Sequence, residues 1–154
     1  MEKIQKELLD MFKEDQKMRA KNSYDIKVDK RNVKRLNQII IKYGWPSSVG
    51  KKAENAAWLI AQHADFNIRF QEKCLKLIQK LPKTKERKSF VAYLTDRIAV
   101  NKKRKQTYGT QFHQGRDGKL KPRPIKDIKN LEKRRKEIGL ESFNKYKKKM
   151  EKLA

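Results

Sequence analysis

An aspartate and an arginine interrupt a mainly apolar helical stretch, and this pair constrains the fold more than any other feature of the sequence. Asp96 and Arg97 lie between the segments 90–95 and 98–100. On a helix, Asp96 shares a face with Ala92, Ala99 and Val100. A carboxylate placed there loses its hydration, so it must be paired or its pKa must rise. Any fold of this chain therefore has to bring partners to Asp96.

Two further polar segments flank this stretch. Gln62-His63-Ala64-Asp65 follows the apolar run 56–61, and Gln106-Thr107-Tyr108-Gly109-Thr110-Gln111 lies just downstream. Together they nominate a site whose candidate catalytic residues are His63 and Asp96. The candidate ligand-binding residues are Gln62, Asp65, Arg97, Gln106, Tyr108, Thr110 and Gln111.

The leading functional hypothesis is a polar pocket that binds a small or extended anionic ligand. In it His63 is the general base, Asp96 orients that base or acts as the acid, and Arg97 binds the anion. Gln106, Tyr108 and Gln111 fix the ligand. We expect His63, Asp96, Arg97 and Gln111 to converge on one concavity, with Asp96 mostly buried. The sequence leaves open whether this pocket also performs metal-independent acid/base chemistry, and so whether the chain is an enzyme.

Each of these residues also has a structural interpretation. His63 borders a buried stripe and is suited to bonding a neighbouring helix. Asp65 is placed to cap the helix that follows it. Asp96 and Arg97 point about 100° apart on a helix, so each should reach a different partner in a buried network. The segment 106–111 resembles a strand edge, in which Gly109 permits a close approach.

Charge suggests a second class of function. The chain carries 42 Lys+Arg against 18 Asp+Glu, a formal net charge of +24. Such a surface attracts nucleic acid, anionic membranes or acidic proteins. However, 31 of these cations are Lys and 11 are Arg, and Lys is less suited than Arg to forked contacts with phosphate. A lysine-rich composition would place such charge on the surface of any fold. The alternative is a non-catalytic basic module that binds RNA, DNA or an acidic protein through 102–105 and the C-terminal helices, with weak and non-specific affinity for nucleic acid.

Several classes of site are absent at the level of motifs. The single cysteine, Cys74, reads as an apolar filler, excludes an internal disulfide and fits a cytoplasmic protein. No leader-like segment and no run of about 18 apolar residues predicts export or a membrane span. His63, Asp65 and the isolated His113 fall short of a catalytic metal set, and no cofactor fingerprint is present. We therefore expect no metal, no cofactor and no membrane.

Helical periodicity dominates the chain. We expect a first helix over about 2–21 and a second that begins at an Asp29 cap and ends at Gly44. A third helix, with an alanine stripe, should cover 53–64, and a fourth should run from Asp65 to Pro82. A fifth should follow a charged linker at 83–88. A short β-hairpin is expected near 106–125, with a turn at 115–118, followed by two helices split near 139–140 and a cap at Ser142.

These elements predict a mainly α fold, a single-domain bundle of six to seven helices with a short β-hairpin near residues 106–125. The expected domain spans 1–154, with an N-terminal helix and connector at 1–28, a core at 30–146 and a basic tail at 147–154.

Five spaced motifs resemble those of an uncharacterised bacterial domain family. They are Gly-Trp-Pro at 44–46, Ala-Trp-Leu-Ile-x-Gln-His-Ala-Asp at 57–65, Leu-Thr-Asp-Arg at 94–97, Gln-x-Tyr-Gly-Thr-Gln-Phe at 106–112 and Arg-Arg-x-x-x-Gly-Leu at 134–140. The resemblance covers roughly residues 30 to 146. It implies a shared fold and a shared polar centre, and it implies no particular mechanism.

Overall fold

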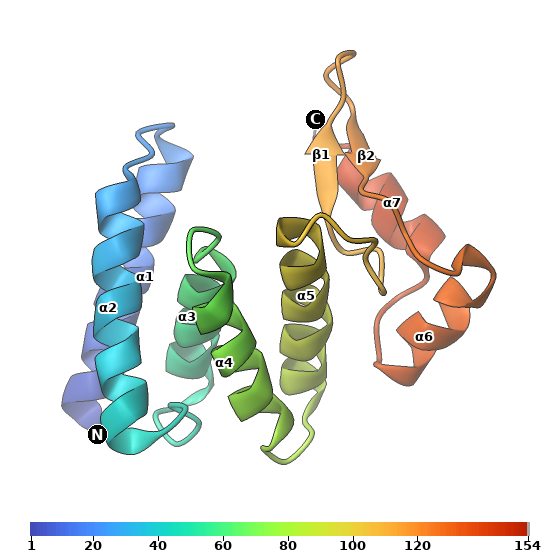
Figure 1. The fold of residues 1–154 in the computed structure, drawn as a ribbon. Helices are drawn as coiled ribbons and strands as arrows, with labels where there is room; N and C mark the ends of the chain where they lie inside the picture. The colour runs from blue at the N-terminus through green and yellow to red at the C-terminus, as the bar shows by residue number, and fades with distance from the viewer. Residues whose placement is uncertain (154) are drawn as a thin grey trace. The chain divides into compact units, whose positions relative to one another are not determined.

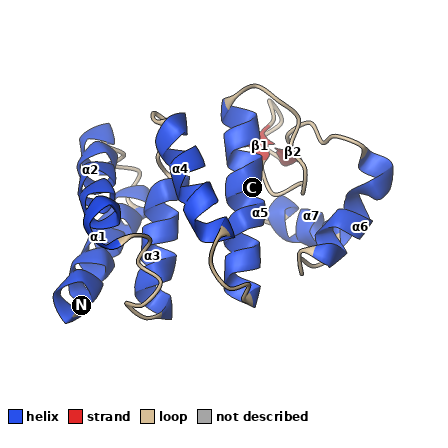
Figure 2. Ribbon diagram, turned by 60° about the horizontal axis from the view of Figure 1, so that its bottom comes forward, coloured by secondary structure: helices blue, strands red, loops and turns tan. Residues whose placement is uncertain are grey.

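The computed structural model describes residues 1–153, which form seven α-helices, one short 3-10 helix and a two-stranded hairpin (Figures 1 and 2). The prediction of a mainly α fold with a hairpin is confirmed. Contacts between residues divide the chain into two compact units, residues 1–77 and 78–154, called unit 1 and unit 2 below.

Unit 1 is helical. It contains α1 (Glu2–Ala20), α2 (Ile26–Tyr43), α3 (Lys51–Gln62) and most of α4 (Ile68–Gln79). α1 packs against both α2 and α3. Small residues make the close approach of α3 possible, because Ala53, Ala56, Ala57 and Ala61 are all fully buried along one stripe. The predicted alanine stripe of this helix is therefore confirmed.

Two predicted helix caps in unit 1 are wrong. α2 begins at Ile26, and its cap is Asp25, which has extended backbone and accepts a hydrogen bond from the Lys27 N–H at 2.9 Å. Asp29 lies inside the first turn of α2, where it is buried. α4 begins at Ile68, and the Oδ1 of Asn67 accepts from the Phe70 N–H at 3.0 Å, so Asp65 is not its cap. In both places two polar residues compete for one cap, and the chain selects the one directly before the helix.

The predicted end of α2 is confirmed. Gly44 has a φ of +78°, a conformation that favours glycine, and its N–H donates to the Ile40 carbonyl at 2.8 Å. Trp45 follows and is 6% exposed. Its indole Nε1–H donates to Glu54 Oε1 at 3.1 Å, which ties the turn to α3.

Unit 2 includes the last two residues of α4, and its first complete helix is α5 (Lys85–Asn101). The cap of α5 is Thr84, whose hydroxyl accepts from the Arg87 N–H at 3.2 Å. The charged linker predicted at 83–88 is therefore mostly helix, because this cap starts α5 inside it. Antiparallel strands β1 (Phe112–Gln114) and β2 (Leu120–Pro122) pair His113 with Lys121 at their centre.

The chain of unit 2 ends in the 3-10 helix η1 (Ile128–Asn130), α6 (Leu131–Glu137) and α7 (Phe143–Glu151). The predicted split between the last two helices is confirmed, since Gly139 has a φ of +78° and lies between them. The predicted cap at Ser142 is also confirmed, because its Oγ accepts from the Lys145 N–H at 3.3 Å.

The prediction that 106–111 forms a strand edge is wrong for most of the segment. Only Gln106 joins a ladder, as an isolated parallel bridge to Ile125. Residues 107–111 form a loop instead, because several of their N–H groups are taken by a side chain of α5.

Candidate functional site

The inner face of α1 carries a buried carboxylate. Asp15 is 2% exposed and lies between Met11 and Met18 on the buried stripe of the helix. Its Oδ1 accepts from Arg19 Nη1 at 2.5 Å, and its Oδ2 accepts from Gln16 Nε2 at 2.8 Å. These partners compensate for the loss of water around the charge.

Arg19 connects this carboxylate to a second one. Its guanidinium donates to both carboxylate oxygens of Asp29 on α2, at 3.1 and 3.0 Å, while it also holds Asp15. A fork with two parallel hydrogen bonds fixes the orientation of both groups. The ring of Tyr24, 5.6 Å from the guanidinium carbon, covers Arg19. α1 and α2 are thus joined by a rigid Asp-Arg-Asp chain.

His63 completes this network from the end of α3. Its Nδ1 lies 2.9 Å from Asp15 Oδ1. A carboxylate can only accept, so Nδ1 must carry the hydrogen, and the neutral ring then has its lone pair on Nε2. The His63 side chain is 16% exposed, whereas that of Asp15 is 2% exposed. The imidazole therefore stands between a buried carboxylate and solvent.

The turn that carries His63 is held by α4. Gln71, which is fully buried, donates through Nε2 to the carbonyls of Ala61 and Gln62 at 3.2 and 3.1 Å, and to Asp65 Oδ1 at 3.4 Å. These bonds hold the last carbonyls of α3, in addition to the bond that the Ala61 carbonyl accepts from the Ala64 N–H at 3.1 Å. Gln62 and Asp65 therefore take part in the support of His63.

The charged neighbours of Asp15 set its protonation. Burial raises its pKa, but the hydrogen bonds from His63 and Gln16 and the charges of His63 and Arg19 outweigh burial, so the pKa of Asp15 lies below its usual value. The carboxylate is therefore ionised at neutral pH. We will call Asp15, Arg19, Asp29 and His63 the histidine network.

Unit 2 contains a second buried carboxylate with a different environment. Asp96 is fully buried in α5, as predicted. Its oxygens accept from the N–H groups of Thr107, Tyr108 and Thr110 at 2.7 to 3.2 Å, and from the Thr110 hydroxyl at 2.9 Å. Burial raises the pKa of Asp96, and these neutral donors offset the effect only in part. The side chain acts as the anchor of the loop.

Two glutamines close the same loop. Gln106 Oε1 accepts from the Gln111 N–H at 2.8 Å, and Gln106 Nε2 donates to the carbonyls of Gln111 and Arg123 at 2.9 and 2.8 Å. Gln111 Oε1 accepts from Arg97 Nη1 at 3.2 Å. As predicted, Asp96 and Arg97 reach different partners. The side chain of Gln106 therefore holds backbone in place, whereas that of Gln111 bonds the side chains of Arg97 and Thr110.

Arginines of α6 hold the loop from its other side. Arg134 Nε donates to the Thr107 carbonyl at 2.9 Å, and Arg135 Nη1 donates to the Tyr108 carbonyl at 2.5 Å. Arg135 is 1% exposed and also lies over the rings of Phe143 and Tyr146. The backbone of 107–110 is thus bonded on both sides.

The close approach expected at Gly109 is made by the protein itself. Gly109 has a φ of +69°, and a Cβ built there would lie 2.9 Å from the Phe143 ring. A side chain at this position would therefore collide with α7.

The predicted site residues are divided between the units. Gln62, His63 and Asp65 belong to unit 1, and the other predicted residues belong to unit 2. The carboxylate bonded to His63 is Asp15, whereas Asp96 holds the loop. Sequence reasoning missed Asp15, Arg19 and Asp29. A signal for Asp15 existed, because it continues the inward spacing of Leu8, Met11 and Met18 on α1.

Other reactive groups are limited in the part of the chain that is described. Burial raises the pKa of the Cys74 thiol to about 12, which keeps it protonated. Among residues 1–153, no three His, Cys, Asp or Glu side chains are grouped so as to hold a metal ion. Within the same range, no helix combines the length and the apolar composition needed to cross a bilayer.

Fold and site together define a mainly α protein with one buried polar centre in each unit. Residues 2–153 match a family described as a family of unknown function (DUF6624), and because the match spans nearly the whole chain, the protein belongs to this family. The family resemblance expected from the sequence is thereby confirmed. No curated protein and no solved structure matches the chain.

Proposed function

We propose that unit 1 carries an acid/base site in which His63 is the general base and Asp15 orients it. One observation carries the proposal: the 2.9 Å contact between His63 Nδ1 and a buried, ionised carboxylate. A base that is held by a carboxylate keeps one tautomer and one orientation, and it is ready to accept a proton on its other nitrogen.

In this proposal Nε2 of His63 accepts a proton from an O–H or N–H group of the substrate, or from a water that attacks it. The imidazolium formed is stabilised by Asp15 and by the carbonyl end of α3, where His63 is the capping residue. Arg19 and Gln16 act on Asp15 and prevent the carboxylate from turning away. The proton then returns from Nε2 to the product.

Unit 1 also contains a buried donor that no described residue satisfies. Asn32 follows Asp29 by three residues, so the two share a face of α2. Asn32 is 3% exposed, and its Nδ2 has no hydrogen-bond partner among the described residues. A buried donor without a partner is costly, and an acceptor on a ligand would remove that cost.

Nuclear magnetic resonance tests the geometry directly, with the second histidine of the chain as an internal reference. We expect ¹⁵N shifts to show His63 as the Nδ1–H tautomer, and Asp15→Asn to weaken that preference. His113, on the hairpin, should not respond to Asp15→Asn. A mixture of tautomers at His63 in the unmodified protein would contradict the proposal.

Hydrolysis of p-nitrophenyl acetate tests the chemistry, because an imidazole that a carboxylate holds in one orientation cleaves this activated ester faster than an unoriented histidine does. We expect His63→Gln to lower the rate by about 10²-fold, the lower end for loss of a general base. His113→Gln is the matched control and should leave the rate unchanged. Equal rates for the wild type and His63→Gln would overturn the proposal.

A further inference from the structure

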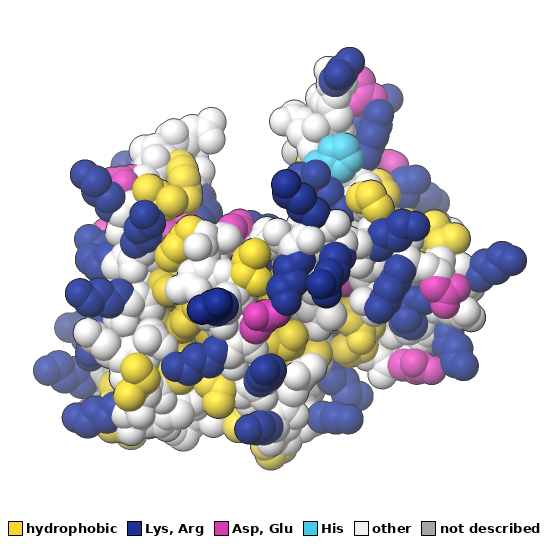
Figure 3. Space-filling view, in the orientation of Figure 1, with side chains coloured by type: hydrophobic (Ala, Val, Ile, Leu, Met, Phe, Trp, Pro, Cys, Tyr) yellow, Lys and Arg dark blue, Asp and Glu magenta, His cyan; other side chains and the backbone are white. Residues whose placement is uncertain are grey.

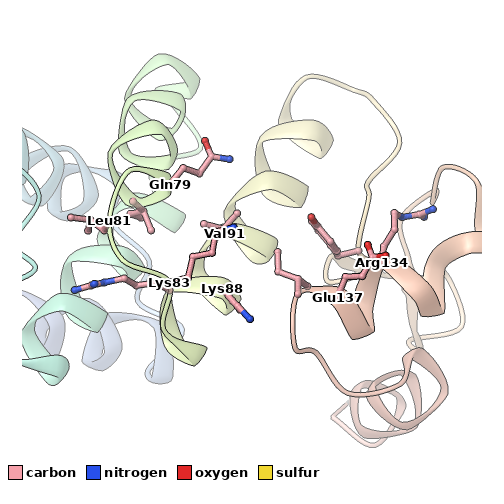
Figure 4. A pocket seen from close by; sticks show the side chains of 11 residues that line it. Gln79, Leu81, Lys83, Lys88, Val91, Arg134 and Glu137 are labelled. Carbon is pink, nitrogen blue, oxygen red and sulfur yellow. The ribbon is translucent and has the colours of Figure 1, made fainter.

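Unit 2 contains a pocket of about 590 Å³, which is within the range that encloses a small organic molecule. It is bordered by α5 and α6 and by Gln79, Leu81 and Lys83 from the segment before α5 (Figure 4). The loop residue Tyr108 also lines it. Its apolar wall is formed by Ile78, Leu81, Val91 and Ile138. This wall offers aliphatic surface to a bound molecule.

Positive charge dominates the polar part of the lining. Lys83, Arg87, Lys88 and Arg134 border the pocket together with a single carboxylate, that of Glu137. Arg134 is fixed by hydrogen bonds to the carbonyls of Thr107, Lys126 and Asp127. It also pairs with the Asp127 carboxylate at 3.4 Å, so the two lysines and Arg87 supply most of the positive charge that a ligand would meet. An excess of cations in a partly enclosed space attracts an anion.

Tyr108 adds an uncharged donor. Its backbone is fixed on both sides, since its N–H donates to Asp96 and its carbonyl accepts from Arg135. Burial and the charge of Asp96 raise the pKa of its hydroxyl, which therefore stays protonated. The anchored loop thus holds a tyrosine at the pocket as a hydrogen-bond donor.

We infer that this pocket binds an organic anion that has one acidic head group and an apolar body. The cations and Tyr108 would receive the head group, and the aliphatic wall would cover the body. A bare inorganic anion would leave that wall unused, and a macromolecular polyanion would not enter a space of this volume. The inference is independent of His63, which belongs to unit 1.

Isothermal titration calorimetry with three matched probes tests the inference on the full chain. Octanoate carries both features, acetate carries only the head group, and 1-octanol carries only the body. We expect octanoate to bind at least about tenfold more tightly than either partial probe, since hydrogen bonds to charged groups and apolar burial both contribute. Octylphosphonate in place of octanoate shows which head group is preferred. Equal affinity for octanoate and 1-octanol, or for octanoate and acetate, would overturn the inference.

Matched variants locate the binding. Lys83→Gln with Lys88→Gln removes two cations from the pocket, and we expect octanoate affinity to fall about tenfold. Lys145→Gln with Lys148→Gln removes the same charge from α7, away from the lining, and should change affinity less than about twofold, as expected for screened surface charge. Tyr108→Phe should weaken binding without altering the far-ultraviolet circular dichroism. Equal losses in both double variants would show a general charge effect and reject the pocket.

Discussion

Asp15 and Asp96 are the same residue type, almost equally buried, yet their environments act in opposite directions. Asp15 is 2% exposed and Asp96 is 0% exposed. The partners of Asp15 include Arg19 and His63, and its pKa is lowered. The partners of Asp96 are backbone amides and one hydroxyl, and its pKa is raised. Burial alone therefore does not set the state of a carboxylate, because the charge of its partners decides.

The two residues also differ in what they position. Asp15 bonds an imidazole that reaches solvent, so its effect extends to a titratable group at the surface. Asp96 bonds the backbone of 107–110, so its effect is on the course of the chain. The comparison separates a carboxylate suited to chemistry from one suited to structure, and the following predictions test that separation.

Asp96→Ala should have the largest effect on stability. It leaves three N–H groups and one hydroxyl without their acceptor inside unit 2, and we expect a loss of about 4 kcal/mol in the free energy of unfolding. Urea unfolding followed by circular dichroism measures this. Asp117→Ala, in the exposed hairpin turn, is the control and should cost far less. A loss below about 1 kcal/mol for Asp96→Ala would mean that the loop does not depend on this carboxylate.

Asp15→Asn should lower the free energy of unfolding by about 2 kcal/mol. The side chain keeps its shape but loses the negative charge that pairs with Arg19 and His63. Trp45 and Trp58 both lie in unit 1, so tryptophan fluorescence during urea unfolding reports on this unit. The control is Glu14→Gln, which neutralises the adjacent carboxylate, an exposed partner of Arg31. Equal costs for the two variants would remove the special role of Asp15.

His63→Ala should cost under about 1.5 kcal/mol, as for a polar group at the edge of a cleft. The imidazole is one of several partners of Asp15, so Arg19 and Gln16 still compensate the carboxylate. The melting temperature gives the measurement, with His113→Ala as reference. A loss comparable to that of Asp96→Ala would make His63 part of the core rather than part of a site.

As pH falls, the contributions of Asp15 and Asp96 to the free energy of unfolding should change in opposite directions. The folded-state pKa of Asp15 lies below 3.8, so its stabilisation is complete above that pH and is lost as pH falls through the folded-state pKa. The folded-state pKa of Asp96 lies above 3.8, so the folded protein takes up its proton first and gains stability as pH falls through that value. Each contribution is the difference in unfolding free energy between the wild type and the Asp→Asn variant, measured from pH 6 to pH 3. If both contributions changed with pH in the same direction, the proposed difference between the two carboxylates would be wrong.

Surface charge should produce the smallest of the expected effects, a weak and non-specific binding of nucleic acid. Unit 1 carries 17 Lys+Arg against 10 Asp+Glu, and unit 2 carries 25 against 8, giving formal net charges of +7 and +17. Lysine and arginine side chains spread over the visible face, with few acidic ones among them (Figure 3). The bridge between Gln106 and Ile125 brings the exposed residues Lys105 and Arg123 into adjacent segments.

Basic-module binding therefore stays a prediction for unit 2. The two aromatic residues of α7 are engaged by Arg135, which leaves phosphate contacts as the main source of affinity for nucleic acid. We expect a dissociation constant of roughly 10⁻⁴ to 10⁻⁶ M at physiological salt, and the affinity should fall steeply as salt is added. Filter binding with several unrelated sequences measures this. Nanomolar, sequence-selective binding would instead favour the basic module as the main function.

The periodic features of the chain were predictable from local sequence. The alanine stripe of α3, the glycine end of α2 and the serine cap of α7 each depend on residues within a few positions of one another. The wrong predictions involve competition between neighbours, as when Asp25 and Asn67 take the capping positions expected for Asp29 and Asp65. The rule that a polar side chain caps the start of each helix held in both places, but the wrong one of two nearby residues was chosen.

The burial of Asp96 and its need for partners could be predicted, because its position in an apolar helix is a local property. The identity of those partners depends on tertiary packing. The donors to Asp96 lie 11 to 14 residues away, and His63 lies 48 residues from Asp15. Periodicity tells which side of a helix faces inward, but not which helix lies opposite, since that depends on packing among all of them. The pairing of His63 with Asp15 therefore comes from the packing of α1 against α3.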